Sequence, residues 1–127
     1  MRTRALLAFI GSLACYTPYL PQQGECVLKT TDNGAEILGT YKGEVLRGTA
    51  DGEGEAVWKS NRRTLIGTYT GSFKSGQMHG RGTFVWANGV KYDGEWSEDT
   101  AHGKGVQTRA DGTVIHSGRW TNDEPAY

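Results

Sequence analysis

The sequence is poor in the residues that most enzymes and nucleic-acid-binding proteins need. Its 127 residues contain only two cysteines and three histidines, and its 14 basic residues are balanced by 14 acidic ones. A chain without net charge offers no electrostatic attraction to nucleic acid. The length allows about one domain and leaves little room for a deep catalytic core. We therefore expect neither a nucleic-acid-binding protein nor an enzyme, and no small-molecule substrate or cofactor.

The sequence also lacks an apolar run long enough to span a membrane. The run from Ala5 to Ala14 follows two arginines and is followed by Pro18 and Pro21, whereas a spanning helix needs about twenty apolar residues. A short apolar run behind basic residues is typical of an export signal. We predict that residues 1–14 are a signal peptide or lipoprotein leader and that residues 15–34 form a tether and an irregular N-terminal cap.

The fate of Cys15 depends on how this leader is processed. Ser12-Leu13-Ala14-Cys15 resembles the lipobox of bacterial lipoproteins, in which the cysteine becomes an acylated lipid anchor. The same small residues, Ser12 and Ala14, also suit an ordinary signal peptidase, and Cys15 would then be able to form a disulfide with Cys26. In a cytoplasmic protein the apolar N-terminus would instead pack on the domain. We predict export to the cell envelope, either lipid-anchored through Cys15 or as a periplasmic or secreted protein.

Glycine and aromatic residues are abundant, and they recur at an interval of 23 residues. The chain has 19 Gly, 4 Trp, 6 Tyr and 3 Phe, which indicates frequent turns between buried rings. Tyr69-Thr70-Gly71-Ser72-Phe73 is followed by His79-Gly80-Arg81-Gly82 and Asn88-Gly89, and Tyr92 begins a second unit with the same intervals. Related units begin near residues 41 and 116. The interval predicts a repeat domain over residues 35–127.

This pattern resembles the membrane occupation and recognition nexus (MORN) repeat, in a small exported bacterial form, from Tyr41 to about Trp120. The resemblance implies roles in protein scaffolding, self-association and attachment to membrane lipids.

The residues of each unit predict one β-hairpin. Side chains alternate between the two faces of a strand, so Tyr92 and Trp96 share a face, and the glycine between them leaves space for a ring from the adjacent strand. The second strand alternates again, with Phe84 beside Trp86 and Val106 beside Thr108, and Asn-Gly or Asp-Gly then forms a tight turn. We predict an all-β fold in which consecutive hairpins form a single extended antiparallel sheet of about seven strands.

The surplus of rings points to binding, because a single-layer sheet cannot cover both of its own faces. We predict a non-catalytic protein-interaction or scaffold module that binds a protein partner or a second copy, with Trp58 and Trp86 as the most accessible rings. The candidate binding residues are Trp58, Tyr69, Phe73, Trp86, Tyr92, Trp96 and Trp120. The alternative is a peripheral membrane module for phospholipid headgroups, although no basic residue recurs in every unit.

The histidines and serines do not indicate a metal site or a catalytic site. His79 and His102 are two strands apart, and no Cys, Asp or Glu recurs beside them to complete a metal site. We expect each of these histidines to hydrogen-bond to turn backbone and to pack beside a ring. We predict no metal site, and no serine recurs with a consistent His and acid partner that would make a catalytic site.

We predict that the mature protein begins near Cys15. Mass spectrometry of the mature N-terminus should show cleavage there, and acylation would add the mass of lipid chains to Cys15. An intact Met1 in the mature protein would contradict export. Membrane association that survives Cys15→Ser together with leader removal would contradict lipid anchoring.

Overall fold

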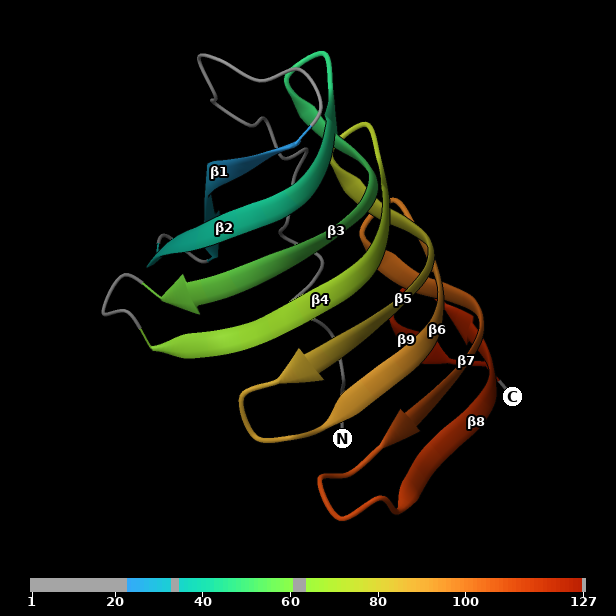
Figure 1. Ribbon diagram of the computed structural model, residues 1–127. Helices are drawn as coiled ribbons and strands as arrows, with labels where there is room; N and C mark the ends of the chain where they lie inside the picture. Colours follow the sequence, from blue (N-terminus) through green and yellow to red (C-terminus); the bar gives the residue numbers. More distant parts are fainter. Residues whose placement is uncertain (1–22, 33–34, 61–63, 127) are drawn as a thin grey trace.

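The chain forms one open antiparallel sheet in which every strand pairs with the next strand in sequence (Figure 1). The computed structural model describes residues 23–32, 35–60 and 64–126. Over these residues the strands are β1 (Gln23–Asp32), β2 (Ala35–Leu46), β3 (Thr49–Ser60), β4 (Leu65–Lys74), β5 (Gln77–Trp86), β6 (Lys91–Ser97), β7 (Thr100–Thr108), β8 (Val114–Thr121) and β9 (Glu124–Pro125). The predicted all-β class and single antiparallel sheet are confirmed.

The sheet begins earlier than residue 35 and has more strands than the seven we predicted. β1 occupies part of the segment expected to be an irregular cap, and it pairs with β2 from Gln23 opposite Glu44 to Asp32 opposite Ala35. The backbone of β2 satisfies its hydrogen bonds, so β1 needs neither a repeat nor an aromatic ring of its own. At the other end, β9 adds two residues. Residues 1–14 and Cys15 lie outside the described residues.

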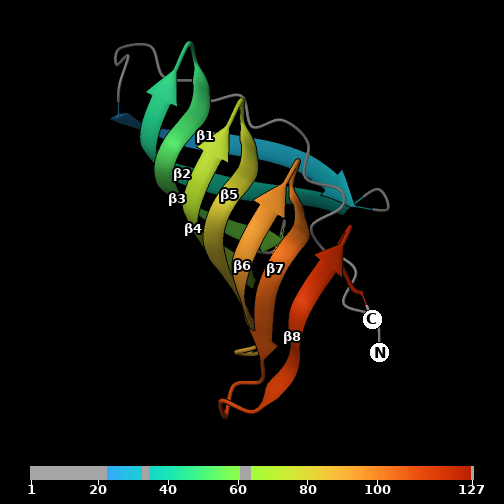
Figure 2. The same cartoon turned by 90° about the vertical axis from the view of Figure 1, so that its right-hand side faces the viewer.

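Two kinds of connection alternate along the chain. Two-residue turns join β2 to β3, β4 to β5, β6 to β7 and β8 to β9, and both residues of each turn have positive φ, as in Arg47 (53°) and Gly48 (79°). This is the geometry of type I′ hairpins, whose twist matches that of the strands. Figure 2 shows the tips of the first three hairpins following one another along one margin. The predicted Gly89 and Gly112 turns, both with φ of 90°, lie in the other connections.

A row of glycines crosses the sheet from β2 to β8. The strand register places seven glycines directly opposite one another: Gly43, Gly54, Gly71, Gly82, Gly94, Gly105 and Gly118. A Cβ at Gly94 would lie 2.5 Å from the carbonyl oxygen of Lys104, so the backbones approach more closely than side chains would allow. The register shifts just after Gly43, Gly71 and Gly94. Irregularities of this kind bend a strand, and the strands curve strongly in Figure 1.

Each repeat tyrosine lies over a glycine of the following strand. Tyr41, Tyr69 and Tyr92 cover Gly54, Gly82 and Gly105. The hydroxyl groups of these tyrosines donate hydrogen bonds to the carbonyl oxygens of Glu44, Ser72 and Glu95, at 2.6, 2.8 and 2.8 Å. The predicted space for a ring is therefore present, but it lies at Gly82 on the neighbouring strand rather than at Gly71 between the two rings. The tyrosine thereby holds both the bulge of its own strand and the backbone of the next.

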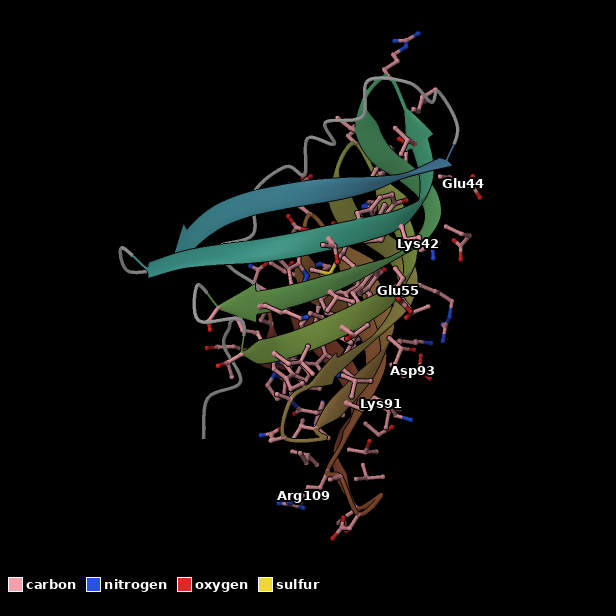
Figure 3. The ribbon with its side chains drawn as sticks, turned by 60° about the vertical axis from the view of Figure 1, so that its left-hand side comes forward. Lys42, Glu44, Glu55, Lys91, Asp93 and Arg109 are labelled. Atoms are coloured by element: carbon pink, nitrogen blue, oxygen red, sulfur yellow. The ribbon has the colours of Figure 1, made fainter. Side chains whose placement is uncertain are left out.

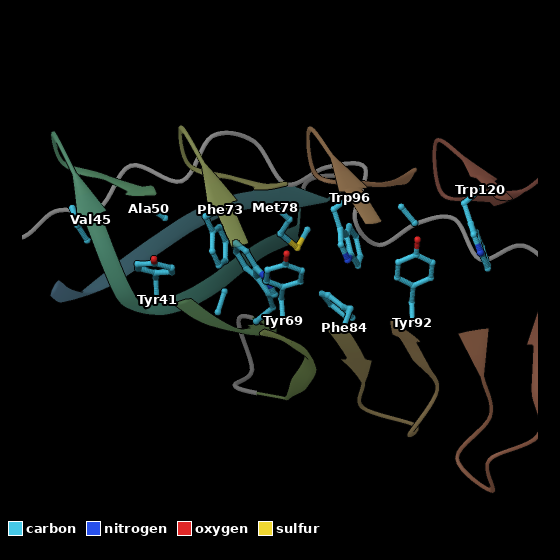
Figure 4. Close-up of a cluster of buried hydrophobic side chains, with 13 residues drawn as sticks. Tyr41, Val45, Ala50, Tyr69, Phe73, Met78, Phe84, Tyr92, Trp96 and Trp120 are labelled. Atoms are coloured by element: carbon cyan, nitrogen blue, oxygen red, sulfur yellow. The ribbon is translucent and has the colours of Figure 1, made fainter. Parts of the chain in front are cut away.

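The rings on the inner side of the curve pack edge to face in a continuous line (Figure 4). Phe73 lies between Tyr41 and Tyr69, with ring centroids 4.9 and 5.0 Å apart. Trp96 lies between Tyr69 and Tyr92, at 5.3 and 5.0 Å, and Trp120 follows at 5.1 Å from Tyr92. Edge-to-face pairs at these distances stabilise a core beyond their buried area. This line of rings links the hairpins into one hydrophobic core.

Gly82→Val should destabilise the fold by more than about 1 kcal/mol, because the added side chain overlaps the Tyr69 ring. A Cβ at this position would lie 2.5 Å from Tyr69 Cε1. Denaturant unfolding followed by circular dichroism measures the effect. The control is Thr70→Val, which adds no volume on the exposed face of β4 and should change the free energy of unfolding little. Equal stability of the two variants would contradict the close packing of rings over glycine.

Candidate functional site

Six of the seven predicted binding residues are core residues. Trp58, Tyr69, Phe73, Tyr92, Trp96 and Trp120 are at most 3% exposed. The expectation that Trp58 is accessible is wrong, since only 1% of its surface is exposed. Trp58 stands directly opposite Gly39 of β2, and a Cβ at Gly39 would lie 2.6 Å from Trp58 Cζ3. The long strands β2 and β3 extend far enough for the indole to pack against the Gly39 backbone.

Trp86 is the one predicted ring that remains partly exposed. Its ring centroid is 4.6 Å from that of Phe84, and with Ile66 it packs against the edge of the core. Gly67 stands directly opposite Trp86, and Leu65, two residues before Gly67 at the start of β4, is 42% exposed. The next repeat has the exposed Arg109 in the position of Trp86. Ile66 and Trp86 are thus partly buried apolar residues at the edge of the core, and we call them, together with the exposed Leu65 next to Ile66 in the chain, the Trp86 surface.

Gln107 occupies a ring position on the inner face that the sequence analysis missed. It stands directly opposite Tyr92, as Phe84 stands opposite Tyr69, and it is 3% exposed. The sequence analysis treated Val106 and Thr108 as the counterparts of Phe84 and Trp86. This is wrong by one residue, because Gln107 holds the position of Phe84 and Val106 and Thr108 lie on the other face. Within the described part of the chain, Gln107 Oε1 accepts no hydrogen bond. A buried unsatisfied acceptor lowers stability, so the line of rings is weakest at β7.

The outer face carries charges of both signs. Lys42 stands opposite Glu55, and Arg81 stands opposite Glu95. Figure 3 shows Lys42, Glu55, Lys91 and Asp93 projecting from this face. Acidic and basic residues are interspersed along the strands, so they do not form a continuous basic patch. This arrangement gives little attraction to an anionic membrane surface.

The buried tyrosine hydroxyl groups serve as hydrogen-bond donors. Burial is the main cause that raises the pKa of Tyr41 to about 12, and neighbouring carboxylates such as Glu44 add to the shift. Burial likewise raises the pKa of Tyr69 and Tyr92 far above the usual range. All three hydroxyl groups therefore stay protonated at physiological pH and keep their bonds to the bulge carbonyls.

In two of the tight turns, an aspartate side chain bonds the hairpin to the preceding one. The Asp99 N–H donates to the carbonyl oxygen of Met78 at 3.1 Å, and Asp99 Oδ1 accepts the Met78 N–H at 2.8 Å. Asp123 makes the same pair of bonds with Ala101, at 3.0 and 2.7 Å. Gly76 occupies the same turn position and makes only the backbone bond, to Ala50 at 2.8 Å. The aspartate side chains thus add a second contact between neighbouring hairpins.

These carboxyl groups have raised pKa values. Burial raises the pKa of Asp99 to about 8, and the charge of Asp123 adds to this effect, although the hydrogen bond from Met78 opposes it. Burial also raises the pKa of Asp123 to about 6. In the sequence, Asp99 only takes the position that Gly76 has in the preceding unit. Its burial follows from the docking of its turn on the preceding hairpin, a contact that the sequence alone does not show.

His102 lies beside a turn, and His116 lies beside a ring. Asn122 N–H donates to His102 Nδ1 at 3.4 Å, and the His116 ring packs edge to face on Trp120 at 5.2 Å. Among the described residues, no group of three or more His, Cys, Asp or Glu side chains is placed to hold a metal ion. The same residues contain no helix that is long and apolar enough to cross a membrane.

Asp99→Asn should reduce the pH dependence of stability. The pKa of an aspartate in the unfolded chain is about 4. Between about pH 4 and 8, Asp99 of the folded protein therefore retains a proton that the unfolded chain releases. The Asp99 contribution therefore lowers the free energy of unfolding as pH rises through this window. The asparagine keeps an acceptor for Met78 without ionising.

The melting temperature of Asp99→Asn should rise relative to the native protein between about pH 5 and pH 9. Glu98→Gln removes a neighbouring exposed charge and serves as the control. A constant difference between Asp99→Asn and the native protein over this range would show that the carboxyl group does not titrate as proposed.

A comparison with protein families connects this geometry with a known repeat. The MORN repeat matches residues 41–61, 69–91 and 92–114. Each of these stretches begins at a tyrosine that covers a glycine, and each contains one of the tight hairpins. MORN repeats are commonly protein- or lipid-binding modules and are generally non-catalytic. A search of curated proteins finds no matching relative. Because the three matches cover more than half of the chain, the protein belongs to the MORN repeat family.

Proposed function

We propose that the protein is a non-catalytic interaction module that binds a protein partner or a second copy through the Trp86 surface. The partial exposure of Trp86 carries this proposal, because the other six predicted rings are used in the core. Aromatic side chains at the centre of an interface commonly contribute most of its binding energy. The core fixes the Trp86 ring against Phe84 before any partner arrives, which reduces the entropy lost on binding.

Phospholipid headgroups are the alternative ligand. The cations needed to bind them do not line up across the sheet, because Arg81 and Lys104 occupy the position that Glu53 holds in the first repeat. The outer-face cations also stand next to carboxylates, as Arg81 does opposite Glu95. Attraction to an anionic surface requires several unopposed cations on one face. The charge distribution therefore favours a protein partner.

The proposed place of action is the cell envelope. The leader pattern before Cys15 supports export, and acylation of Cys15 would hold the sheet near a membrane without any lipid contact by the repeats. Membrane association by this route would be independent of the Trp86 surface. The two contributions are therefore separable by mutation.

Trp86→Ala should weaken association at least about tenfold, since loss of an aromatic anchor commonly costs 2 kcal/mol or more and about 1.4 kcal/mol corresponds to one decade in affinity. The full chain carrying Cys15→Ser is examined by sedimentation equilibrium over a range of concentrations. It is also sedimented with acidic and with neutral vesicles. We expect salt to have little effect on self-association.

Val85→Ala is the matched control, because Val85 is the exposed neighbour of Trp86 on the opposite face of β5. It should leave association unchanged. A strictly monomeric protein that acidic vesicles capture in a salt-sensitive manner would reverse the assignment in favour of lipid headgroups.

A further inference from the structure

Two connections at one margin of the sheet have the same local geometry (Figure 1). The first joins β5 to β6 through Asn88 and Gly89, and the second joins β7 to β8 through Asp111 and Gly112. Both glycines have a φ of 90°. Each glycine N–H donates to the carbonyl oxygen three residues earlier in the chain, at 2.9 Å. The two connections are therefore equivalent turns of successive repeats.

The two connections differ in the side chain before the glycine. Asn88 Oδ1 accepts the Val90 N–H at 3.0 Å, and Asp111 Oδ1 accepts the Thr113 N–H at 2.8 Å. A side-chain amide in one turn thus makes the bond that a carboxyl group makes in the other. The fold already accommodates an aspartate in this kind of turn, so replacement of the Asn88 amide by a carboxylate requires no rearrangement.

The turn requires a glycine after Asn88. The φ of Gly89 lies in the left-handed region, and a Cβ at Gly89 would lie 2.6 Å from the Cβ of Ala110 in the neighbouring connection. Glycine has no side chain to hinder access to its backbone nitrogen. Asn88 itself is exposed to water. The turn therefore keeps a chemically labile amide directly before an unhindered backbone nitrogen.

The bonds that hold Asn88 and Gly89 in this turn are local. The Gly89 N–H is bonded to Trp86, and Asn88 Oδ1 is bonded to Val90. When these two bonds open, the Gly89 nitrogen can approach Cγ of Asn88 while β5 and β6 stay paired. Local openings of this kind cost much less free energy than global unfolding. A reaction between the two groups therefore does not need the sheet to unfold.

We propose that Asn88 is a site of spontaneous deamidation in the folded protein, with water as the other reactant. The Gly89 nitrogen attacks Cγ of Asn88, so that a new bond closes a succinimide ring and the bond from Cγ to the side-chain nitrogen breaks. Ammonia leaves and takes the proton of the Gly89 nitrogen with it. Water then opens the ring at one of its two carbonyl carbons. The product is an aspartate or an isoaspartate at position 88.

The Asp111 turn does not lose charge or mass by the same route. A hydrogen bond from the Thr113 side chain, together with one from its backbone N–H, lowers the pKa of the Asp111 carboxyl group. The carboxyl group is therefore ionised at neutral pH, and a carboxylate is a poor target for a nucleophile. Of these two turns, the one at Asn88 alone gains a negative charge with time.

The two products affect the fold differently. The aspartate form would match the Asp111 turn and would place a negative charge two residues from Trp86. In the isoaspartate form the main chain runs through Cγ, which lengthens the connection. This change would disturb the bond from the Trp86 N–H to the Val90 carbonyl oxygen, now 2.8 Å long. The modification itself does not depend on the function proposed for the Trp86 surface.

Peptide mapping of the full chain after prolonged incubation at mildly alkaline pH tests the proposal. Trypsin releases Gly82–Lys91, which should gain about one mass unit and separate into an aspartate and an isoaspartate form. Asn122 is the reference within the same chain, and it should convert at least about tenfold more slowly, because the side chain of the following aspartate hinders the backbone nitrogen. Asn33 also precedes a glycine but lies outside the described residues, and its peptide, Thr30–Lys42, is analysed separately.

Two substitutions give matched controls. Asp111→Asn should introduce the reaction into the equivalent turn, at a rate within about threefold of that at Asn88, because local opening breaks the same bonds in both turns. Asn88→Ser keeps an oxygen that can accept the Val90 N–H and should abolish the mass change. Circular dichroism checks that both variants remain folded.

Urea below the unfolding transition separates local opening from global unfolding. A local opening exposes little surface, so the rate at Asn88 should stay nearly constant as urea is added. A reaction through the unfolded chain would instead accelerate steeply with urea.

Three outcomes would overturn the proposal. The first is an unchanged mass at Asn88 after a time in which the free synthetic peptide Gly82–Lys91 has converted completely. The second is a rate that rises steeply with urea, because the reaction would then belong to the unfolded chain. The third is an Asp111→Asn protein that stays unmodified at position 111, because the shared turn geometry would then not permit the reaction.

Discussion

The packing of a tyrosine ring on a glycine of the next strand is the contact on which the rest of the structure depends. At this position any side chain larger than hydrogen would overlap the ring, as at Gly82 under Tyr69. The same glycine row allows the backbones to approach and the strands to bend. Bending turns the rings toward one another, and only then can Phe73 and Trp96 lie between successive tyrosines. Over the residues that the structure describes, a single-layer sheet thereby acquires a core without a second sheet or a helix above it.

This use of the rings determines where binding can occur. A flat sheet with the same residues would expose its aromatic face, but the curved sheet uses six of the seven candidate rings for its own stability. An accessible ring is left at the margin of the core, at Trp86, where the next repeat has Arg109. A departure from the repeat pattern is therefore a better indicator of function here than the repeated residues themselves.

The strands and turns of the repeats were predictable because their signals are local. Tyr-x-Gly-x-aromatic and Asn-Gly act within a few residues, and the interval of 23 residues relates them along the chain. β1 was missed because its pairing depends on the length of β2 rather than on its own residues. The burial of Trp58 depends on Gly39, on another strand, and the burial of Asp99 depends on the preceding hairpin. These features arise from contacts between hairpins, and one sequence alone does not show them.

The docking of each turn on the hairpin before it has a consequence for how such a chain can change length. Asp99 contacts Met78 and Asp123 contacts Ala101, so each turn bonds only to its immediate predecessor. The ring and glycine contacts are equally restricted to neighbouring strands. A tandem duplication of residues 69–91 would therefore lengthen the array by one hairpin and repeat the ring and glycine contacts at the new junction. The turn of the second copy would bring Gly76 rather than Asp99 to Met78, so that junction would keep the backbone bond and lack the side-chain bond.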